Sequence, residues 1–470
     1  MRLTITDLNH RGEGVGREQG LAVFVPGAVP GDVVRVELSE RKKSHARARL
    51  VDVIEPSPDR VAALCPVAAA CGGCQLQFLS YPAQLRWKRQ YLQETLRRVG
   101  GLSVEVAPTM GMEHPWGYRN KGQFPLGRQG GRVVAGCFAP GTHRIVPVEH
   151  CPLQHPAGNR VLAAGRSLLE EMHIPIYDEV ADRGFARHLI SRVAVHTGQS
   201  MGVLVTRQWT PPAPPASADW PGAFPRRWAE MAPGLASVYQ NLNPRRTNII
   251  MGPQDRLLWG RPAIEDQLLG LRFLISAHSF YQVNPYQAEA MYALVREWAA
   301  LRGDEMVLDL YCGVGTIALV LAAAGQGRSP SVVGVEEVPQ AVADARQNAR
   351  LNGLDRVEFL CGRAEDILPS LLADRAPRVV VLDPPRQGVD ARVLTALVGA
   401  ASGTGGMSAP SRAAAGGGGA CRLIYVSCHP ATLARDLAIL VQGGFHLERV
   451  QPVDMFPQTA HIETVASLRR

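Results

Sequence analysis

The sequence predicts an α/β protein in which a doubly wound parallel sheet follows a small β-barrel and a central β-rich region. From about residue 271 onward, strand-like apolar runs alternate with helical runs, which is the pattern of a doubly wound sheet. The first part of the chain instead holds short strand-like runs separated by Pro-Gly turns, as in OB-like barrels. We therefore expect three domains, at residues 1–58, 59–260 and 261–470.

Composition narrows the class of protein. The chain has 470 residues, a hydrophobic fraction of 46% and a formal net charge of +8, from 50 basic and 42 acidic side chains. This balance suits an anionic partner such as nucleic acid. The segment Met1–Asp7 has no apolar signal character and no run approaches a membrane span, so we expect a cytoplasmic protein without membrane contact. Nine cysteines in a reducing compartment favour ligands or catalysts over disulfides.

The amino-terminal segment is expected to contain strands at Leu21–Val25, Asp32–Leu38 and Arg49–Ile54. The stretch 41–49 carries five basic residues and is interpreted as a hairpin tip, which is either simply solvated or in contact with a nucleic-acid backbone. This segment resembles the TRAM domain, a small RNA-binding barrel appended to RNA-modifying enzymes. Residues 56–58, Pro-Ser-Pro, are interpreted as the linker that leaves the barrel.

Four thiols form a candidate metal-binding set: Cys65, Cys71, Cys74 and Cys151. Two thiolates two residues apart can reach one metal from a tight turn, and the intervening Gly72-Gly73 permits such a turn. The Cys71–Cys74 pair alone is compatible with a redox pair or half a zinc site. The full set fits either a cubane iron–sulfur cluster or a structural zinc, and the spacing does not choose between them. Cys137 is predicted to be a core residue.

The next region is predicted to hold an amphipathic helix at 82–99 and then an antiparallel sheet between residues 114 and 206. The basic face of the helix is compatible with RNA contact or with ordinary solvation. A Pro-rich surface insertion is expected at 210–222. An aromatic residue is interleaved with two cations at Tyr118, Arg119 and Lys121. This pattern is typical of a surface that binds single-stranded nucleic acid, and a polar strand edge is the alternative interpretation.

A ligand-binding turn is predicted after the buried strand Met306–Leu310. Gly313 and Gly315 allow a ligand to approach the backbone, and a helix follows. Asp309 precedes the turn, while Glu336 ends the next strand and is placed to accept ribose hydroxyls. The turn lacks the third glycine of a dinucleotide site and the lysine of a Walker site. The pattern therefore favours the phosphate-free ligand S-adenosylmethionine.

Three further side chains lie where strands end or where a charge is unexpected. Asp383 follows a buried strand and precedes two prolines and Arg386. Cys428 follows the strand-like run Leu423–Val426, at the sheet edge where reactive groups collect, although a buried bystander thiol is the alternative. Glu463 interrupts an apolar strand and so requires a partner or a chemical role. A Gly/Ala/Ser-rich loop is expected at 401–420.

Taken together, these motifs resemble the bacterial RNA (uracil-5-)-methyltransferases, most closely the iron–sulfur-containing 23S ribosomal RNA uracil methyltransferases. The resemblance runs nearly end to end and implies a class I S-adenosylmethionine-dependent methyltransferase fold, a TRAM barrel, a central iron–sulfur domain and a monomer acting on 23S rRNA. It is carried by the barrel, the four cysteines, the run 280–285 (Phe-Tyr-Gln-Val-Asn-Pro), the turn 309–315, Asp383-Pro384-Pro385-Arg386, Ser427-Cys428 and His461-Ile462-Glu463.

The resemblance also implies roles for individual residues. Cys428 matches the nucleophile and Glu463 the general base. The methyl-donor site matches at Gln282, Tyr311, Thr316, Glu336 and Asp383. The ligands of a [4Fe-4S] cluster match at Cys65, Cys71, Cys74 and Cys151.

Two positions depart from the family pattern: His429 and Thr316 stand where asparagine is usual. A protonated imidazole at 429 would lower the pKa of the neighbouring thiol, whereas a neutral one would only replace a structural amide. Thr316 keeps a hydroxyl and loses the amide.

Three alternative functions compete with a 23S rRNA uracil methyltransferase. A tRNA uracil-5-methyltransferase is the closest, although relatives of the bacterial tRNA enzyme lack the barrel and the cysteines. A non-catalytic RNA-binding protein with a structural zinc belongs to another class. An amino-methyltransferase is disfavoured, because Arg386 follows the two prolines where that motif needs an aromatic side chain.

Overall fold

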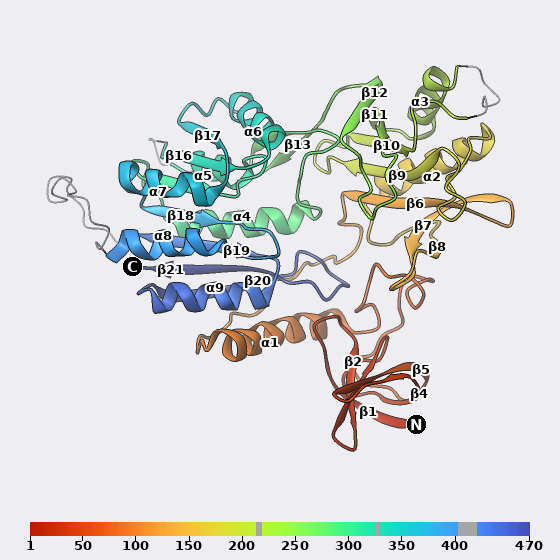
Figure 1. Ribbon diagram of the computed structural model, residues 1–470, viewed down its shortest axis with the longest axis horizontal. Coiled ribbons are helices and arrows are strands. Elements are labelled where there is room, and N and C mark those ends of the chain that lie inside the picture. Colours follow the sequence, from red (N-terminus) through yellow and green to blue (C-terminus); the bar gives the residue numbers. More distant parts are fainter. Residues whose placement is uncertain (213–218, 326–328, 403–420) are drawn as a thin grey trace.

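The structure is a computed structural model that describes residues 1–212, 219–325, 329–402 and 421–470. A small barrel, a central sheet and a second sheet covered by helices follow one another along the chain (Figure 1). None of the helices in these ranges is long and apolar enough to cross a membrane. The loop predicted at 401–420 falls almost entirely outside the described residues.

The amino-terminal strands close into a barrel in the order β1-β2-β3-β5-β4, which confirms the predicted barrel. Its strands are β1 (Arg2–Leu8), β2 (Gly14–Glu18), β3 (Leu21–Val25), β4 (Val33–Arg41) and β5 (His45–Glu55). The predicted hairpin tip is confirmed at residues 42–44 but is shorter than 41–49, because β4 runs to Arg41 and β5 begins at His45. Period-two alternation explains the difference: Ala46 and Ala48 point into the barrel core, while Arg47 and Arg49 point outward and pair with acids.

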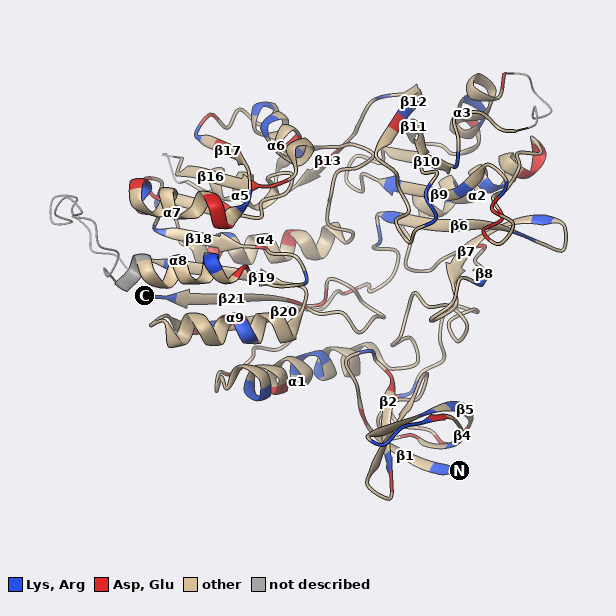
Figure 2. Cartoon of the chain, in the orientation of Figure 1, with Lys and Arg blue, Asp and Glu red and all other residues tan. Residues whose placement is uncertain are grey.

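Helix α1 (Tyr81–Gly100) connects the barrel to the rest of the molecule and packs against helix α9 (Pro430–Gln442) of the last domain. Basic residues are frequent along it (Figure 2). Pro82 stands at its start, where a missing N–H costs nothing, and Gly101 ends it in the left-handed conformation. Lys88 is fully buried among the helix's apolar positions and does not belong to the basic face predicted for this helix.

The central domain holds a seven-stranded sheet in the order β12-β11-β10-β9-β6-β7-β8. Its elements are β6 (Lys121–Gln129), β7 (Arg132–Phe138), β8 (Ile145–Pro147), α2 (Pro156–Glu171), β9 (Ala186–Val193), β10 (Ser200–Thr206), α3 (Trp220–Met231), β11 (Leu235–Leu242) and β12 (Gln254–Gly260). The pairs among β6, β7, β8, β9 and β10 are all antiparallel, which confirms the sheet predicted between residues 114 and 206. The whole sheet is mixed, because α3 crosses over between β10 and β11 and returns the chain in the same direction.

The Pro-rich insertion is also partly wrong. Trp220 begins α3, is only 3% exposed and packs against Phe185 and Phe224, so it is a core residue. Residues 220–222 form the first turn of α3 rather than a surface loop. Pro221 stands in the first helical turn and starts the helix. Residues 213–218 of that prediction lie outside the described part of the chain.

The carboxy-terminal domain contains a seven-stranded sheet in the order β17-β16-β15-β18-β19-β21-β20, in which only the pairs made by β21 are antiparallel. A hairpin of β13 (Ile264–Leu268) and β14 (Leu271–Ile275) precedes it. The other elements are α4 (Pro285–Ala299), β15 (Met306–Leu310), α5 (Thr316–Ala322), β16 (Ser331–Glu336), α6 (Pro339–Leu351), β17 (Val357–Cys361), α7 (Ala364–Arg375), β18 (Val379–Leu382), α8 (Ala391–Ser402), β19 (Arg422–Ser427), α9 (Pro430–Gln442), β20 (His446–Val453) and β21 (Glu463–Arg469).

Helices cover both faces of this sheet, as a doubly wound fold requires. One apolar cluster packs residues of α4, α5 and α6 against one face, and a second packs residues of α7, α8, α9 and α1 against the other. Strands β15, β16 and β18 are buried on both faces, which explains their unbroken apolar runs. The predicted doubly wound sheet is confirmed, and its strand ends converge on one edge.

Candidate active site

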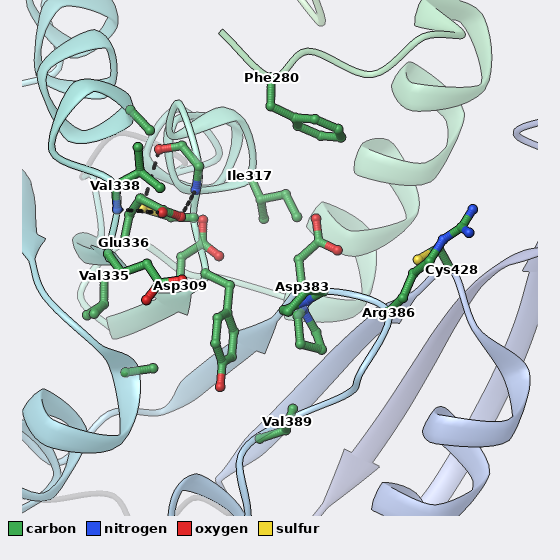
Figure 3. A pocket seen from close by; sticks show the side chains of 18 of the residues that line it. Phe280, Asp309, Ile317, Val335, Glu336, Val338, Asp383, Arg386, Val389 and Cys428 are labelled. Atoms are coloured by element: carbon green, nitrogen blue, oxygen red, sulfur yellow. Dashed lines mark hydrogen bonds between the residues drawn. The ribbon is translucent and has the colours of Figure 1, made fainter. Parts of the chain in front are cut away.

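A cavity of about 1080 Å³ lies at the carboxyl ends of the parallel strands, where a doubly wound sheet places its ligands (Figure 3). All the residues predicted for the donor site and for catalysis line this one cavity: Gln282, Tyr311, Thr316, Glu336, Asp383, Cys428 and Glu463. Their side chains come from six separate segments of the chain. The fold therefore brings together residues that the sequence spreads over 182 positions, from 282 to 463.

The floor of the cavity is the turn between β15 and α5. Tyr311, Gly313 and Gly315 have φ values of 66°, 55° and 81°, so the turn is left-handed at three places. A Cβ atom on Gly315 would lie 2.7 Å from the ring of Phe359, which makes glycine obligatory there. The turn exposes backbone N–H groups toward the end of β16. Glu336 fixes it by accepting a hydrogen bond from the Gly313 N–H at 3.1 Å.

Three carboxyl groups are concentrated in the cavity without compensating partners of their own. Asp309 is fully buried, and neither of its side-chain oxygens has a hydrogen-bond partner in the described structure. Burial and the neighbouring Asp383 raise the pKa of Asp309 well above its ordinary value. Burial raises the pKa of Asp383 to about 7. Burial and the negative charge of Asp383 together raise the pKa of Glu463 well above its ordinary value. Such an acidic pocket favours a cationic ligand.

Cys428 lies just past the end of β19 and opposite Glu463, the first residue of β21. Burial raises the pKa of its thiol to about 11, with the charges of Glu463 and Asp383 acting in the same direction. Arg386 opposes them through its charge and a hydrogen bond to the sulfur. Figure 3 shows the Arg386 side chain beside Cys428 at the mouth of the cavity. Cys428 is therefore a half-buried cavity residue and not a core bystander.

His429 does not act on the neighbouring thiol. It is the N-cap of α9, and its Nδ1 accepts a hydrogen bond from the Thr432 N–H at 3.3 Å. Burial and the charge of Arg386 lower the pKa of its imidazole, which keeps the ring neutral. Of the two interpretations of this substitution, the structural replacement of an amide agrees with the geometry, because asparagine is an equally good N-cap.

The segment 454–461, which supplies Phe456 and His461 to the cavity wall, is held from outside the domain. Lys88 of α1 donates to Asp454 Oδ1 at 2.5 Å and to the Phe456 carbonyl at 3.2 Å, and both charged side chains are fully buried. Tyr118 donates to the Pro457 carbonyl at 2.9 Å. Sequence reasoning missed this brace. The available signal was that Lys88 lies four residues before Leu92, within the apolar stripe of its helix.

Tyr118 also corrects a second expectation. Its ring is fully buried, so it cannot stack on a base in the way predicted for a single-strand surface. Lys121 is half-buried at the start of β6, where burial and the nearby arginines 192 and 119 lower its pKa to about 8.

The four predicted ligand cysteines occupy one neighbourhood between the barrel and the central sheet. Their charges influence one another: Cys65, Cys71 and Cys151 all contribute to raising the pKa of Cys74, after burial, to about 12. Cys137 joins them. It is half-buried rather than a core residue, and both thiols are free. A hydrogen bond from Cys137 to the Cys71 sulfur lowers the pKa of Cys71 to about 6. Within the described ranges, however, no three His, Cys, Asp or Glu side chains are arranged as a metal-binding group.

Comparisons with known proteins agree with this architecture. Residues 1–51 match the TRAM domain family, and residues 301–391 match a methyltransferase domain family. An uncharacterized RNA methyltransferase of Halalkalibacterium halodurans is 43% identical over 100% of this chain and 96% of its own length. One of Listeria monocytogenes is 41% identical, over 100% of this chain and 97% of its own. The solved Pyrococcus abyssi tRNA (uracil-54, C5)-methyltransferase, in complex with S-adenosyl-L-homocysteine, shares 28% identity and a TM-score of 0.76, with 100% of both chains covered.

The doubly wound sheet with its glycine turn and acidic cavity defines an S-adenosylmethionine-dependent methyltransferase. With its amino-terminal TRAM barrel, the chain belongs to the family of RNA methyltransferases that these full-length relatives represent.

Proposed function

We propose that this enzyme methylates carbon 5 of a uridine in RNA through a covalent adduct on Cys428. The observation that carries the proposal is the pairing, in one cavity, of the Cys428 thiol with the Glu463 carboxyl beside the donor-binding turn. A thiol and a base are the two groups that methylation at this carbon requires, whereas a nitrogen attacks the methyl group with its own lone pair and needs no thiol adduct. The likeness to the tRNA (uracil-54, C5)-methyltransferase of Pyrococcus abyssi supports the same reaction.

The reaction begins with the thiolate of Cys428, which adds to C6 of the uracil and turns C5 into an enolate carbon. S-adenosylmethionine supplies an electrophilic methyl group on a positively charged sulfur. C5 attacks that methyl group, and the thioether S-adenosylhomocysteine is left. Glu463 then removes the proton from C5, and the electrons of that C–H bond expel the Cys428 thiolate. The thiolate is regenerated, and the protein returns to its starting state once Glu463 has released the C5 proton to solvent.

The electrostatics of the cavity match this order of events. Without ligands the thiol is protonated at neutral pH, since its pKa is about 11. Arg386 provides a positive charge at the sulfur, and the acids around the turn are suited to a sulfonium. A bound cation lowers the pKa of neighbouring acids and thiols. Binding of the donor is therefore expected to convert both Cys428 and Glu463 toward the ionised forms that the chemistry uses.

The covalent step is tested with RNA that contains 5-fluorouridine, whose C5 fluorine cannot be removed by a base. Wild-type protein should form a stable RNA–protein complex, and Cys428→Ala should form none and should not methylate. Cys361→Ala is the matched control, because Cys361 is exposed at the end of β17 and does not line the cavity. Full activity of Cys428→Ala would refute the mechanism.

We propose 23S rRNA as the substrate, with tRNA as a second candidate. The sequence argument for 23S rRNA was that relatives of the bacterial tRNA enzyme lack the barrel. The Pyrococcus abyssi tRNA enzyme is similar over all of this chain, barrel included, so that argument does not exclude tRNA. Mapping C5-methyluridine in rRNA and tRNA from cells with and without the protein decides between them, because the modification should disappear from only one class.

We also propose that Cys65, Cys71, Cys74 and Cys151 hold a [4Fe-4S] cluster, with structural zinc as the alternative. Support comes from the donor set, since four thiols gather between two domains and Gly72 and Gly73 give the loop its tight turn. The four sulfurs would move closer together when the cluster binds. Anaerobically purified protein should be brown and contain iron and sulfide, and Cys151→Ser should lose the colour while Cys361→Ser keeps it. A colourless protein containing zinc would contradict the cluster.

A further inference from the structure

A second cleft, of about 1550 Å³, lies in the central domain and shares no lining residue with the catalytic cavity. Its walls come from the β6–β7 hairpin and from three connections in the described chain. These are the β7–β8 turn (139–144), the stretch 175–184 before β9, and residues 247–250 before β12. Nothing in the methyl-transfer chemistry uses this cleft, so its composition has to be explained separately.

Cations predominate among the charged side chains that line the cleft: Arg128, Arg144, Arg183 and Arg187. Two acids, Asp178 and Glu179, lie among them, and both are engaged. Glu179 pairs with His143, and Asp178 accepts backbone N–H bonds within its own turn. The guanidinium groups of Arg144 and Arg183, by contrast, have no hydrogen bond or ion pair with any described residue. Exposed arginines without partners provide contacts for phosphates.

Flat π-systems lie beside these cations. The exposed His143 ring stacks on Phe138, with centroids 5.0 Å apart and an interplanar angle of 17°. On the other side of the cleft, the Arg187 guanidinium lies 4.8 Å above the Tyr177 ring. Imidazole and guanidinium planes accept a base by stacking. Cations and planar groups in one groove are the combination found in single-strand nucleic-acid sites.

The cleft also contains polar atoms that lack partners. Arg187 is 7% exposed, and its Nε is buried without a hydrogen bond, although its Nη1 donates to the carbonyls of Asn243 and Arg245. The adjacent His188 has a buried Nδ1 that is also unpaired among the described residues. Unsatisfied buried donors and acceptors are costly, so a ligand that hydrogen-bonds them would be favoured. The edge of a base carries both donors and acceptors.

The cleft and the catalytic cavity lie on the two sides of one short loop. Gly72 and Gly73 of this loop line the cleft. A few residues on, the N–H groups of Gln75 and Leu76 donate to the Gln458 carbonyl at 3.1 and 3.0 Å. Gln458 belongs to the segment that supplies Phe456 and His461 to the catalytic cavity. A strand that crosses this loop would therefore pass from the cleft toward the segment that borders the catalytic cavity.

We propose that this cleft binds a single-stranded segment of the same RNA molecule whose target base enters the catalytic cavity. The phosphates would contact Arg144 and Arg183, and bases would stack at His143 and reach the buried atoms of Arg187 and His188. The inference rests on RNA as the substrate but not on the position that is methylated. The cleft would select for RNA that is unpaired beside the target nucleotide.

The test measures binding of fluorescein-labelled poly(U) to the full-length protein without methyl donor, over a series of salt concentrations. The double variant Arg144→Glu/Arg183→Glu should bind at least about tenfold more weakly at low salt, and its salt slope should fall by about 1.4, because each lost phosphate contact on a single strand removes about 0.7. The control Arg160→Glu/Arg226→Glu makes the same change of charge on exposed positions of α2 and α3 outside the cleft, and should keep the wild-type slope.

His143→Ala separates stacking from charge. It should weaken binding about fivefold or more while the salt slope is retained. Wild-type affinity and slope in the double variant, or an equal loss in the control pair, would overturn the inference. Because poly(U) binding is scored without turnover, this failure is distinct from failure of the 5-fluorouridine trap at Cys428.

Discussion

Removal of the buried charge on Lys88 should destabilise the enzyme far more than removal of an exposed, ion-paired charge on the same helix. Lys88 and Asp454 are both 0% exposed and their charged atoms are 2.5 Å apart. In Lys88→Met the Asp454 carboxylate remains buried without its cation, and its Oδ2 already has no partner in the described structure. Breaking a buried pair in this way costs about 3–5 kcal/mol.

The matched control is Arg86→Met, two positions earlier on α1. Arg86 pairs with Asp59 at 2.8 Å, but the two side chains are 63% and 45% exposed. An exposed pair of this kind contributes at most about 1 kcal/mol. The double variant Lys88→Met/Asp454→Leu removes both charges and should recover much of the stability, because an apolar pair replaces a buried ionic pair at little cost.

Guanidinium denaturation monitored at several wavelengths measures the free energy of unfolding, and methylation assays measure the consequence for the site. We expect Lys88→Met to lower kcat as well as stability, since the pair holds the segment that carries Phe456 and His461. We expect the double variant to regain stability but not kcat, because the hydrogen bond to the Phe456 carbonyl stays lost. If Lys88→Met is no less stable than Arg86→Met, the reasoning is refuted.

Three further predictions concern the catalytic cavity. Glu463→Gln should still form the adduct with RNA but should turn over about 10²–10⁴-fold more slowly, because no base removes the proton from C5. A denaturing gel should show the RNA–protein complex accumulating, and rapid turnover would rule out Glu463 as the base. In the folded protein Asp383 has a pKa of about 7, against 3.8 for the free side chain, so it binds its proton more tightly when folded. Its contribution to the free energy of unfolding is full below about pH 4 and is lost as the pH rises to about 7, by at most about 4 kcal/mol. Asp383→Asn should flatten this part of the plot of unfolding free energy against pH, and an unchanged plot would contradict the assignment. Glu336→Ala removes the acceptor that fixes the glycine turn and should weaken S-adenosylhomocysteine binding about tenfold or more by calorimetry, whereas Glu297→Ala on the exposed face of α4 should not.

The sequence predicts features that depend on neighbouring residues better than features that depend on residues far apart in the chain. Asp309, Glu336 and Asp383 could be found because each follows or ends an apolar run, and parallel strands place such positions on one edge. Lys88 could not be paired with Asp454, since 366 positions separate them and each is an ordinary charged residue in its own segment. Trp220 was misjudged for a related reason, because local Pro and Gly suggested a surface turn while its burial depends on a sheet assembled elsewhere.

The residue beside the nucleophile shows the same limit at the shortest range. His429 stands next to Cys428 in the sequence and invites the interpretation that an imidazole activates the thiol. A residue that follows a strand and precedes a helix is, however, also an N-cap, and the cap hydrogen bond with Thr432 turns the ring toward its own helix. The positive charge at the sulfur comes instead from Arg386, 42 positions earlier, after the two prolines that end β18. Arg386, which distinguishes this motif from an amino-methyltransferase, is therefore also the residue that favours the thiolate against burial and the two acids Glu463 and Asp383.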